Sequence, residues 1–394
     1  MKRLLAVLIA CLLIAGCAFC EETESLQSKY EESVVFDALK TLCRCATDDL
    51  NKWACTKSVR KDSSAYKKIT SYDAGWFGKV RKREYLEFSS ANWTEPDENS
   101  FECDVFGINR ITYTYGNLVK DYSLAYHMRF ERTSAAKNDW LLTEFSNLPL
   151  ETDAALALRV TNEYEGLSLY TVTGGCYRGF MLVIDDPSRV FVGTIDTFSS
   201  TAEGKLIDVL AAKYSALAAI NGGGFEDGDK STGGKPTGLV ISQGVQKSNN
   251  NPYSDTGKVI MGFDTNDKLI VGTFKNDEIE GLNLRDALAF NRALIINGEA
   301  QSADKAQYTT RTAIGQDGEG RVLMLVVEGR QPDSLGASFE DEIEIMLSFG
   351  AVNAGNLDGG NSSVMYLDGE NIYGGYPHAV SRRMPAAFMV SDIN

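Results

Sequence analysis

Three segments in the second half of the sequence combine glycine, charged and hydroxyl residues. These residue types are unfavourable for the folded structure alone, so their presence suggests a role in binding or catalysis. The first is an apolar run that ends in Asn221 and three glycines, which let the backbone approach a ligand closely. The second places Arg311 before one apolar run, and Glu328 and Arg330 directly after the next. The third is Asp358, followed by two glycines, an asparagine and two serines. An acid at a strand end, followed by two glycines and two hydroxyls, is typical of a loop that faces a ligand, so these segments are candidates for a binding or catalytic site.

Each segment also has a purely structural interpretation. Three glycines after a strand can form a tight turn, and an arginine at a strand end usually makes a surface ion pair. The segment after Asp358 fits this interpretation less well, because a simple Asp-Gly turn needs neither a flanking asparagine nor the paired Ser362 and Ser363. It favours a loop that faces a ligand.

The order of these motifs resembles that of the phosphodiester glycosidase family. The resemblance covers about residues 170–394 and rests on Asn-Gly-Gly, Arg-Thr-Ala-Ile-Gly, Gly-Arg-Gln and Asn-Leu-Asp-Gly-Gly-x-Ser-Ser, in that order. Residues 234–238 add a Gly-x-Pro-x-Gly step. The sequence departs from the family in two places, with Asn361 where a third glycine is common and Gly224 where an aromatic residue often precedes Phe225. These departures concern the shape of the substrate site more than its chemistry.

The resemblance implies hydrolysis of a sugar-1-phosphodiester, such as that of N-acetylglucosamine, into a sugar and a phosphomonoester. A phosphomonoester leaves as a stable anion, so it needs a cationic clamp more than strong protonation, and we assign the clamp to Arg311 and Arg330. We expect Asp358 to be the nucleophile or general base, and Glu328 to be the acid or the residue that orients Arg311. Further donors to the sugar or phosphate are expected from Asn221, Gly222, Gly223, Gly359, Gly360, Ser362 and Ser363.

Two other classes of function remain open. One is a carbohydrate-binding surface lipoprotein without catalysis, although a binder would not need both carboxylates. The other is a scaffold whose first part docks a partner. A bound calcium ion is also open, because Asp227 and Asp229 hint at a calcium loop, but the full EF-hand spacing is missing. Two histidines in the whole chain leave little room for a histidine-rich metal site.

The expected fold class is α+β, with a larger β-rich glycosidase domain at residues 151–394. Strand-turn-strand patterns predict hairpins at 261–271, 312–327 and 364–373. Helical patterns occupy 206–213 and a segment that begins at Ser338 with a capping box and stops before Gly350. The ends of these elements must bring the three motif segments together.

Residues 21–150 are expected to form a smaller domain of unknown role. Residues 30–56 have helical periodicity, and a later segment alternates, with Tyr122, Leu124, Tyr126, Met128 and Phe130 on one face. Helices followed by a meandering sheet give an outline similar to that of NTF2-like domains. Cys43, Cys45, Cys55 and Cys103 are either disulfide partners or buried thiols.

The first twenty residues read as a signal peptide, with two positive charges and a short apolar run before Cys17. The residues before Cys17 resemble a bacterial lipoprotein box, so we expect lipidation at Cys17, a membrane anchor and an extracytoplasmic location. Ordinary cleavage and secretion is the alternative. The expected partner is a glycan or sugar-phosphate polymer. Nucleic acid is not expected, because the net charge of the chain is −15.

Overall fold

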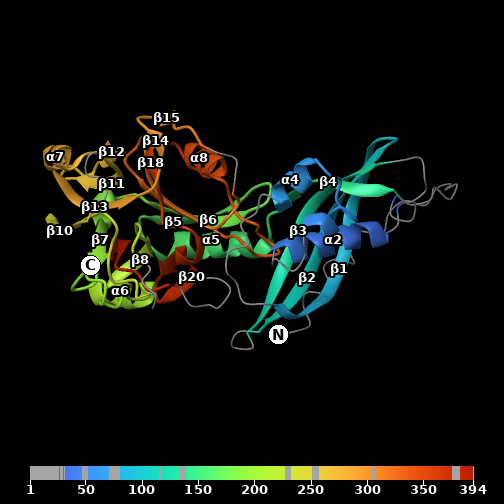
Figure 1. The fold of residues 1–394 in the computed structure, drawn as a ribbon, viewed down its shortest axis with the longest axis horizontal. Coiled ribbons are helices and arrows are strands. Elements are labelled where there is room, and N and C mark those ends of the chain that lie inside the picture. The colour runs from blue at the N-terminus through green and yellow to red at the C-terminus, as the bar shows by residue number, and fades with distance from the viewer. Residues whose placement is uncertain are drawn as a thin grey trace.

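The computed structural model divides into two parts along its long axis (Figure 1). It describes residues 26, 30, 32–46, 52–70, 80–114, 118–133, 139–226, 232–250, 257–303, 307–374 and 382–393. Within these ranges, strands from the first part form one sheet with one another, and the later strands form three further sheets. Among the described residues, no helix is both long enough and apolar enough to cross a bilayer.

The first part is a helical layer on one antiparallel sheet. Its helices are α2 (Glu32–Ala46), α3 (Lys52–Cys55) and α4 (Ser64–Thr70). Its strands run in the order β1 (Val80–Asp97), β2 (Ser100–Tyr113), β3 (Val119–Arg132) and β4 (Trp140–Asn147). The expected order of helices followed by a meander is confirmed, although the helical pattern of 30–56 is divided between α2 and α3.

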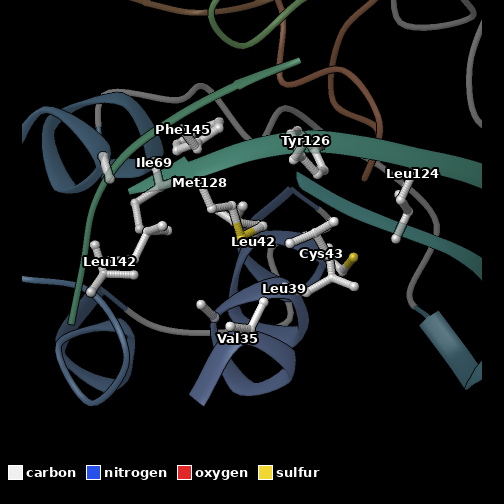
Figure 2. Close-up of a cluster of buried hydrophobic side chains, with 14 of the residues drawn as sticks. Val35, Leu39, Leu42, Cys43, Ile69, Leu124, Tyr126, Met128, Leu142 and Phe145 are labelled. Carbon is white, nitrogen blue, oxygen red and sulfur yellow. The ribbon is translucent and has the colours of Figure 1, made fainter. Parts of the chain in front are cut away.

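Alternation along β3 explains how this sheet packs. The five apolar residues predicted to share a face are all buried, and they belong to one apolar core with residues of α2. Figure 2 shows Leu124, Tyr126 and Met128 beside the apolar stripe of α2. That stripe consists of Val35, Leu39 and Leu42, spaced so that they fall on one side of the helix. The described cysteines are buried thiols, with no disulfide among them: Cys43, Cys45, Cys55, Cys103 and Cys176.

The second part contains three sheets. The first has the order β10 (Val245–Asn249), β9 (Leu239–Ser242), β13 (Leu284–Phe290), β11 (Lys258–Asp264), β12 (Leu269–Phe274). The second has the order β15 (Glu299–Ala300), β14 (Ala293–Ile296), β18 (Ala351–Leu357), β16 (Arg311–Asp317), β17 (Val322–Val327), β6 (Arg178–Ile184), β5 (Leu167–Thr173). The third has the order β20 (Glu370–Gly374), β19 (Val364–Leu367), β8 (Ala216–Asn221), β21 (Ala386–Ser391), β7 (Val190–Thr194).

Helices in this part are short, and they lie between the strands in sequence. They are α5 (Glu151–Glu163), α6 (Ile207–Tyr214), α7 (Asn276–Ile279) and α8 (Phe339–Ser348), with one-turn 3₁₀ helices η1 (Pro187–Arg189), η2 (Glu280–Leu282) and η3 (Gly360–Ser362). The three predicted hairpins and both predicted helices are present, which confirms the α+β class. The boundary near residue 150 stays a prediction.

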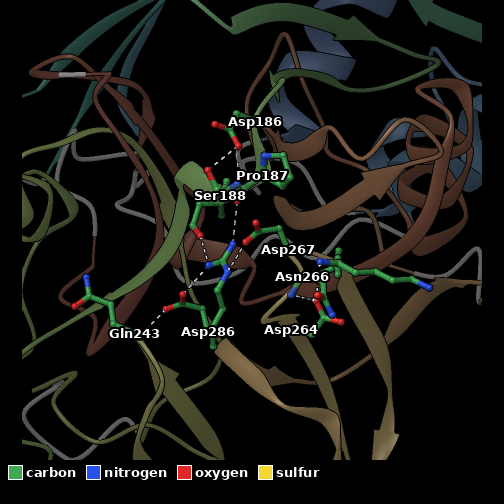
Figure 3. A network of polar contacts seen from close by, with 12 residues as sticks. Asp186, Pro187, Ser188, Gln243, Asp264, Asn266, Asp267 and Asp286 are labelled. Atoms are coloured by element: carbon green, nitrogen blue, oxygen red, sulfur yellow. Dashed lines mark hydrogen bonds and ion pairs between the residues drawn. The ribbon is translucent and has the colours of Figure 1, made fainter.

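A buried carboxylate joins two of these sheets (Figure 3). Asp286 of β13 accepts hydrogen bonds from the backbone N–H of Val192 in β7, at 2.8 Å, and of Gln243, at 2.9 Å. Its other oxygen lies 2.7 Å from Arg285, which also bonds Asp267. Burial raises the pKa of Asp286, and these donors oppose the rise. The network therefore fixes β7 against β13.

The pairing of β16 brings several strand ends to one edge of the second sheet. Arg311, the first residue of β16, lies opposite Val327, the last residue of β17. Thr312 lies opposite Leu357, the last residue of β18. Because these strands are antiparallel, the residues that precede β16 and follow β17 and β18 share one end of the sheet. This end carries the motif segments.

Candidate active site

The side chain of Asn221 connects the three motif segments by hydrogen bonds. Its Nδ2 donates to the carbonyl oxygen of Asp358 at 2.6 Å, and its Oδ1 accepts from Thr312 Oγ1 at 2.8 Å and from the N–H of Val364 at 3.1 Å. Thr312 Oγ1 also lies 3.0 Å from Ser363 Oγ. Asn221 is 1% exposed, and both polar atoms of its side chain bind other groups of the protein. It holds the site together rather than projecting toward a ligand.

The glycines of the motifs allow backbones to pack closely. A Cβ on Gly222 would lie 2.5 Å from the carbonyl oxygen of Ala386, and one on Gly223 would lie 2.2 Å from that of Ala289. Gly359 is packed in the same way against Thr310. A side chain at these positions would push neighbouring strands apart, so packing is sufficient to require glycine there.

Gly360 differs from the other motif glycines. It has a φ of 60°, and the nearest atoms to an added Cβ belong to the guanidinium of Arg330, at 3.7 Å. The N–H of Gly360 donates to the carbonyl oxygen of Thr310, and Thr310 Oγ1 donates back to the carbonyl oxygen of Gly360 at 2.5 Å. These bonds fix the loop after Asp358 against the start of β16.

The two predicted clamp arginines have different surroundings. Arg330 has a φ of 59° and donates from Nη1 to Oδ1 of Asn361 at 3.2 Å, which places its guanidinium beside the loop after Asp358. Arg311 donates to the carbonyl oxygens of Ala337, at 3.0 Å, and Gln307, at 2.9 Å. It is 6% exposed. Arg330 is buried to a similar extent, at 8% exposed. The two differ in their partners, because Arg311 donates to backbone carbonyl oxygens and Arg330 contacts the loop after Asp358.

The carboxylate beside Arg311 is Glu342 of α8, not Glu328. Glu342 Oε2 lies 3.9 Å from Arg311 Nε, and Oε1 accepts from Asn356 Nδ2 at 3.4 Å. The ring of Phe339 lies 3.8 Å from the guanidinium of Arg311. Glu342 is fully buried, and this burial raises its pKa to about 8 although Arg311 opposes the rise.

Glu328 does not contact the Arg311–Glu342 pair but belongs to a second group of charges, at the end of β17. Burial raises its pKa to about 7, and the carboxylate of Asp333 adds to this rise, while Lys120 and Arg178 oppose it. Burial also raises the pKa of Asp333, and its Oδ1 has no hydrogen-bond partner among the described residues. Arg178 is itself held by Asp153 of α5 at 2.5 Å. Glu328 can therefore keep a proton near neutral pH.

Asp358 and the serines complete the loop after β18. Asp358 is partly buried, and its N–H donates to the carbonyl oxygen of Gly222 at 3.1 Å. Ser363 is engaged by Thr312, whereas the buried Oγ of Ser362 has no hydrogen-bond partner among the described residues. Asp358 and the unsatisfied hydroxyl of Ser362 thus belong to one short loop, and the guanidinium of Arg330 lies beside this loop.

Sequence reasoning missed two acidic residues of this region. The sequence did contain a signal for Glu342. This residue lies on the face of the predicted helix that carries Ile345 and Met346, and an acid among buried apolar residues needs a partner. Asp333 had none, since the residues around it are typical of a turn. The predicted residue Cys17 and the hinted calcium residues Asp227 and Asp229 lie outside the described residues. Within the described ranges, no three potential metal ligands of the His, Cys, Asp or Glu type come together.

Residues 214–391 match the sequence model of the phosphodiester glycosidase family. This stretch, which contains all three motif segments, is therefore a domain of that family, and the resemblance inferred from the motif order is confirmed for it. The match therefore gives the class of this stretch, which is that of a phosphodiester glycosidase domain.

The individual proteins and solved structures that the chain resembles share 13% to 28% sequence identity with it. The SPbeta prophage-derived uncharacterized protein YomE of Bacillus subtilis (strain 168) is 28% identical over 217 residues, which are 51% of this chain and 33% of that protein. The chain thus spans about a third of the length of this relative. Among solved structures, the zebrafish N-acetylglucosamine-1-phosphodiester alpha-N-acetylglucosaminidase catalytic domain aligns with 18% identity and a TM-score of 0.47, covering 78% of this chain and 88% of that one. A hypothetical protein from Synechocystis aligns with 13% identity and a TM-score of 0.41, covering 80% and 83%.

Proposed function

We propose that this chain hydrolyses a sugar-1-phosphodiester, with N-acetylglucosamine as the first sugar to test, on an extracytoplasmic glycan or wall polymer. The observation that supports this most directly is the meeting of the motif segments. Asp358 is tied to Asn221 and Gly222, and its loop is tied to Arg330 through Asn361. A carboxylate and a guanidinium at one strand end suit a reaction in which a sugar carbon is attacked and a phosphate leaves.

The proposed reaction cleaves the bond between the anomeric carbon and the bridging oxygen. Either Asp358 removes a proton from water as the water attacks this carbon, or Asp358 attacks it first and water then releases the sugar. In both cases the bridging oxygen leaves with the phosphomonoester, whose negative charge Arg330 stabilises. Glu328, which holds a proton up to a pH of about 7, supplies that proton to the bridging oxygen.

Isotope incorporation tests which bond breaks. The purified chain is incubated with N-acetylglucosamine-1-phosphodiesters in water enriched in oxygen-18, and the phosphomonoester is analysed by mass spectrometry. Cleavage at the anomeric carbon leaves the phosphomonoester unlabelled. Label in the phosphomonoester would mean attack at phosphorus and would refute the glycosidase proposal. Saturable binding without any product would favour the carbohydrate-binding lipoprotein instead.

Two substitutions test the assigned groups. We expect Asp358→Asn to lower kcat by a factor of about 10³ or more, because it removes the nucleophile or base. Asp277→Asn, at an exposed position of α7, is the matched control. Arg330→Met should lower kcat/KM by about 10²-fold through loss of a charge-assisted contact, whereas Arg159→Met, at a half-buried position of α5, should not. Activity that survives Asp358→Asn would remove Asp358 from the mechanism.

We further propose that the chain is a membrane-anchored lipoprotein. The support is the sequence around Cys17. Metabolic labelling with a palmitate analogue in a bacterial host should label the wild type and not Cys17→Ala, and the variant should leave the membrane fraction. Equal labelling of both would refute lipidation at Cys17.

A further inference from the structure

The sheet of the first part contacts a loop of the glycosidase domain that begins at the site. We call residues 329–337, between β17 and α8, the site loop. Three consecutive loop residues are bound by side chains of β3 and β4. Lys120 Nζ donates to Oε1 of Gln331 at 2.9 Å, the hydroxyl of Tyr126 donates to the carbonyl oxygen of Pro332, and Asn147 Nδ2 donates to that of Asp333 at 2.5 Å.

Apolar packing adds to these hydrogen bonds. Leu335 of the site loop is 1% exposed and belongs to the apolar core of the first part, together with Cys176. The N–H of Leu335 donates to the carbonyl oxygen of Cys176 at 2.8 Å. Tyr126 is also buried. The site loop is therefore packed into the first part of the chain rather than lying on its surface.

The conformation of the site loop requires such support. Arg330 has a φ of 59°, which an arginine rarely adopts, and Gly336 has a φ of 119° with the backbone of Thr309 too close for a Cβ. Between them, Gln331 and Ser334 exchange two backbone hydrogen bonds, at 2.9 and 3.1 Å. A tight turn with an unfavourable residue at its base persists only when its surroundings hold it in place.

The loop position also determines which charges surround Glu328. Asp333, on the loop, raises the pKa of Glu328, and Lys120, on β3, lowers it. The other charges that act on Glu328 come from Arg178 of β6 and Asp153 of α5. The first part therefore contributes a cation to the electrostatic surroundings of this carboxyl group.

We propose that the first part of the chain is a working component of the glycosidase site, in which Lys120, Tyr126 and Asn147 are positioning residues that hold the site loop so that Arg330 and Glu328 face the substrate. This inference rests on the proposed function. It gives residues 21–150 a role: they complete a neighbouring active site.

The test compares matched pairs of substitutions in the full chain. Tyr126→Phe removes the hydroxyl that binds Pro332, and Tyr122→Phe, on the same strand, removes an equally buried hydroxyl that bonds Tyr113 instead. Lys120→Met removes the cation at the loop, and Lys82→Met removes an exposed one that pairs with Glu84 on β1. Lys120→Arg tests rescue by a retained charge.

Two readouts are needed, and neither depends on global stability alone. We expect amide hydrogen exchange to accelerate in peptides covering 328–337 for Tyr126→Phe and Lys120→Met, but not for the two controls. We expect kcat to fall about 10-fold with KM less affected, and the pH–rate profile of Lys120→Met to move to higher pH, because loss of a cation raises the pKa of Glu328. Lys120→Arg should restore the wild-type profile.

The outcomes separate this inference from the proposed function. If the wild type is active and both loop variants match it in kcat and exchange, the positioning role is wrong. If the wild type releases no sugar, the proposed function fails, and exchange still decides whether the first part holds the loop. Unchanged exchange in that case would refute the inference as well.

Discussion

Replacing Glu342 with glutamine should change how the stability of the protein depends on pH. Glu342 is fully buried, and its pKa in the folded chain is about 8, against an ordinary value of 4.5. The folded state therefore keeps this proton between about pH 5 and pH 8, whereas the unfolded chain has lost it. Since the unfolded state then binds fewer protons, stability falls as pH rises through this window.

The magnitude follows from the size of the shift. Each pKa unit corresponds to about 1.4 kcal/mol, so titration of Glu342 removes about 3 kcal/mol of stability between pH 5 and pH 8. The side chain of the Glu342→Gln variant cannot ionise, and its amide oxygen can still accept from Asn356. The variant should therefore lose about 3 kcal/mol less than the wild type over the same range, while every other group titrates equally in both.

Urea denaturation at pH 5, 6, 7 and 8 measures this difference. Glu344→Gln, at an exposed position of the same helix, is the control and should follow the wild type at each pH. Parallel curves for Glu342→Gln and the wild type would mean that Glu342 is ionised throughout, as a conventional ion pair with Arg311. That result would refute our account of the buried helix face.

Three further predictions concern the site and its supports. Glu328→Gln should abolish the fall in activity that we expect above a pH of about 7, where Glu328 loses its proton; a pH–rate profile that keeps this fall would assign it to another group. Gly222→Ala places a Cβ 2.5 Å from the carbonyl oxygen of Ala386, so thermal unfolding should show a loss of about 1–3 kcal/mol, and an unchanged melting temperature would contradict the packing argument. Ser338→Ala removes the cap that accepts from the N–H of Asp341 at 3.1 Å, and urea unfolding should show a loss of about 1 kcal/mol; no loss would mean that the cap is dispensable.

Local patterns predicted the elements well because each one is set by neighbouring residues. The alternation around Tyr126 placed one face of β3 in the core, and the turn at Asp264 closed the hairpin of β11 and β12. The order of strands could not be predicted in this way. β21 pairs with β7 although they lie at opposite ends of the glycosidase domain in sequence, and no local pattern encodes a partner at that distance.

The candidate site was predictable in its motifs but not in its contacts. The order of the glycine, arginine and acidic segments was sufficient to indicate the family. The sequence could not show that Arg311 donates to the carbonyl oxygen of Ala337, or that the acid beside it is Glu342. These facts depend on where α8 packs. The contact of the site loop with Tyr126 depends in the same way on how two distant parts of the chain meet.

The place of β21 in its sheet affects when the domain can fold during synthesis. Residues Ala386–Ser391 lie between β8 and β7, so the third sheet has a gap in its interior until they have left the ribosome. Pairings this distant in sequence form slowly, because a long loop must close first. Until these residues are in place, β8 and β7 each lack a partner, and the third sheet cannot be completed. Completion of this sheet is therefore a late step in the folding of the domain, and the strand that completes it controls when its interior closes.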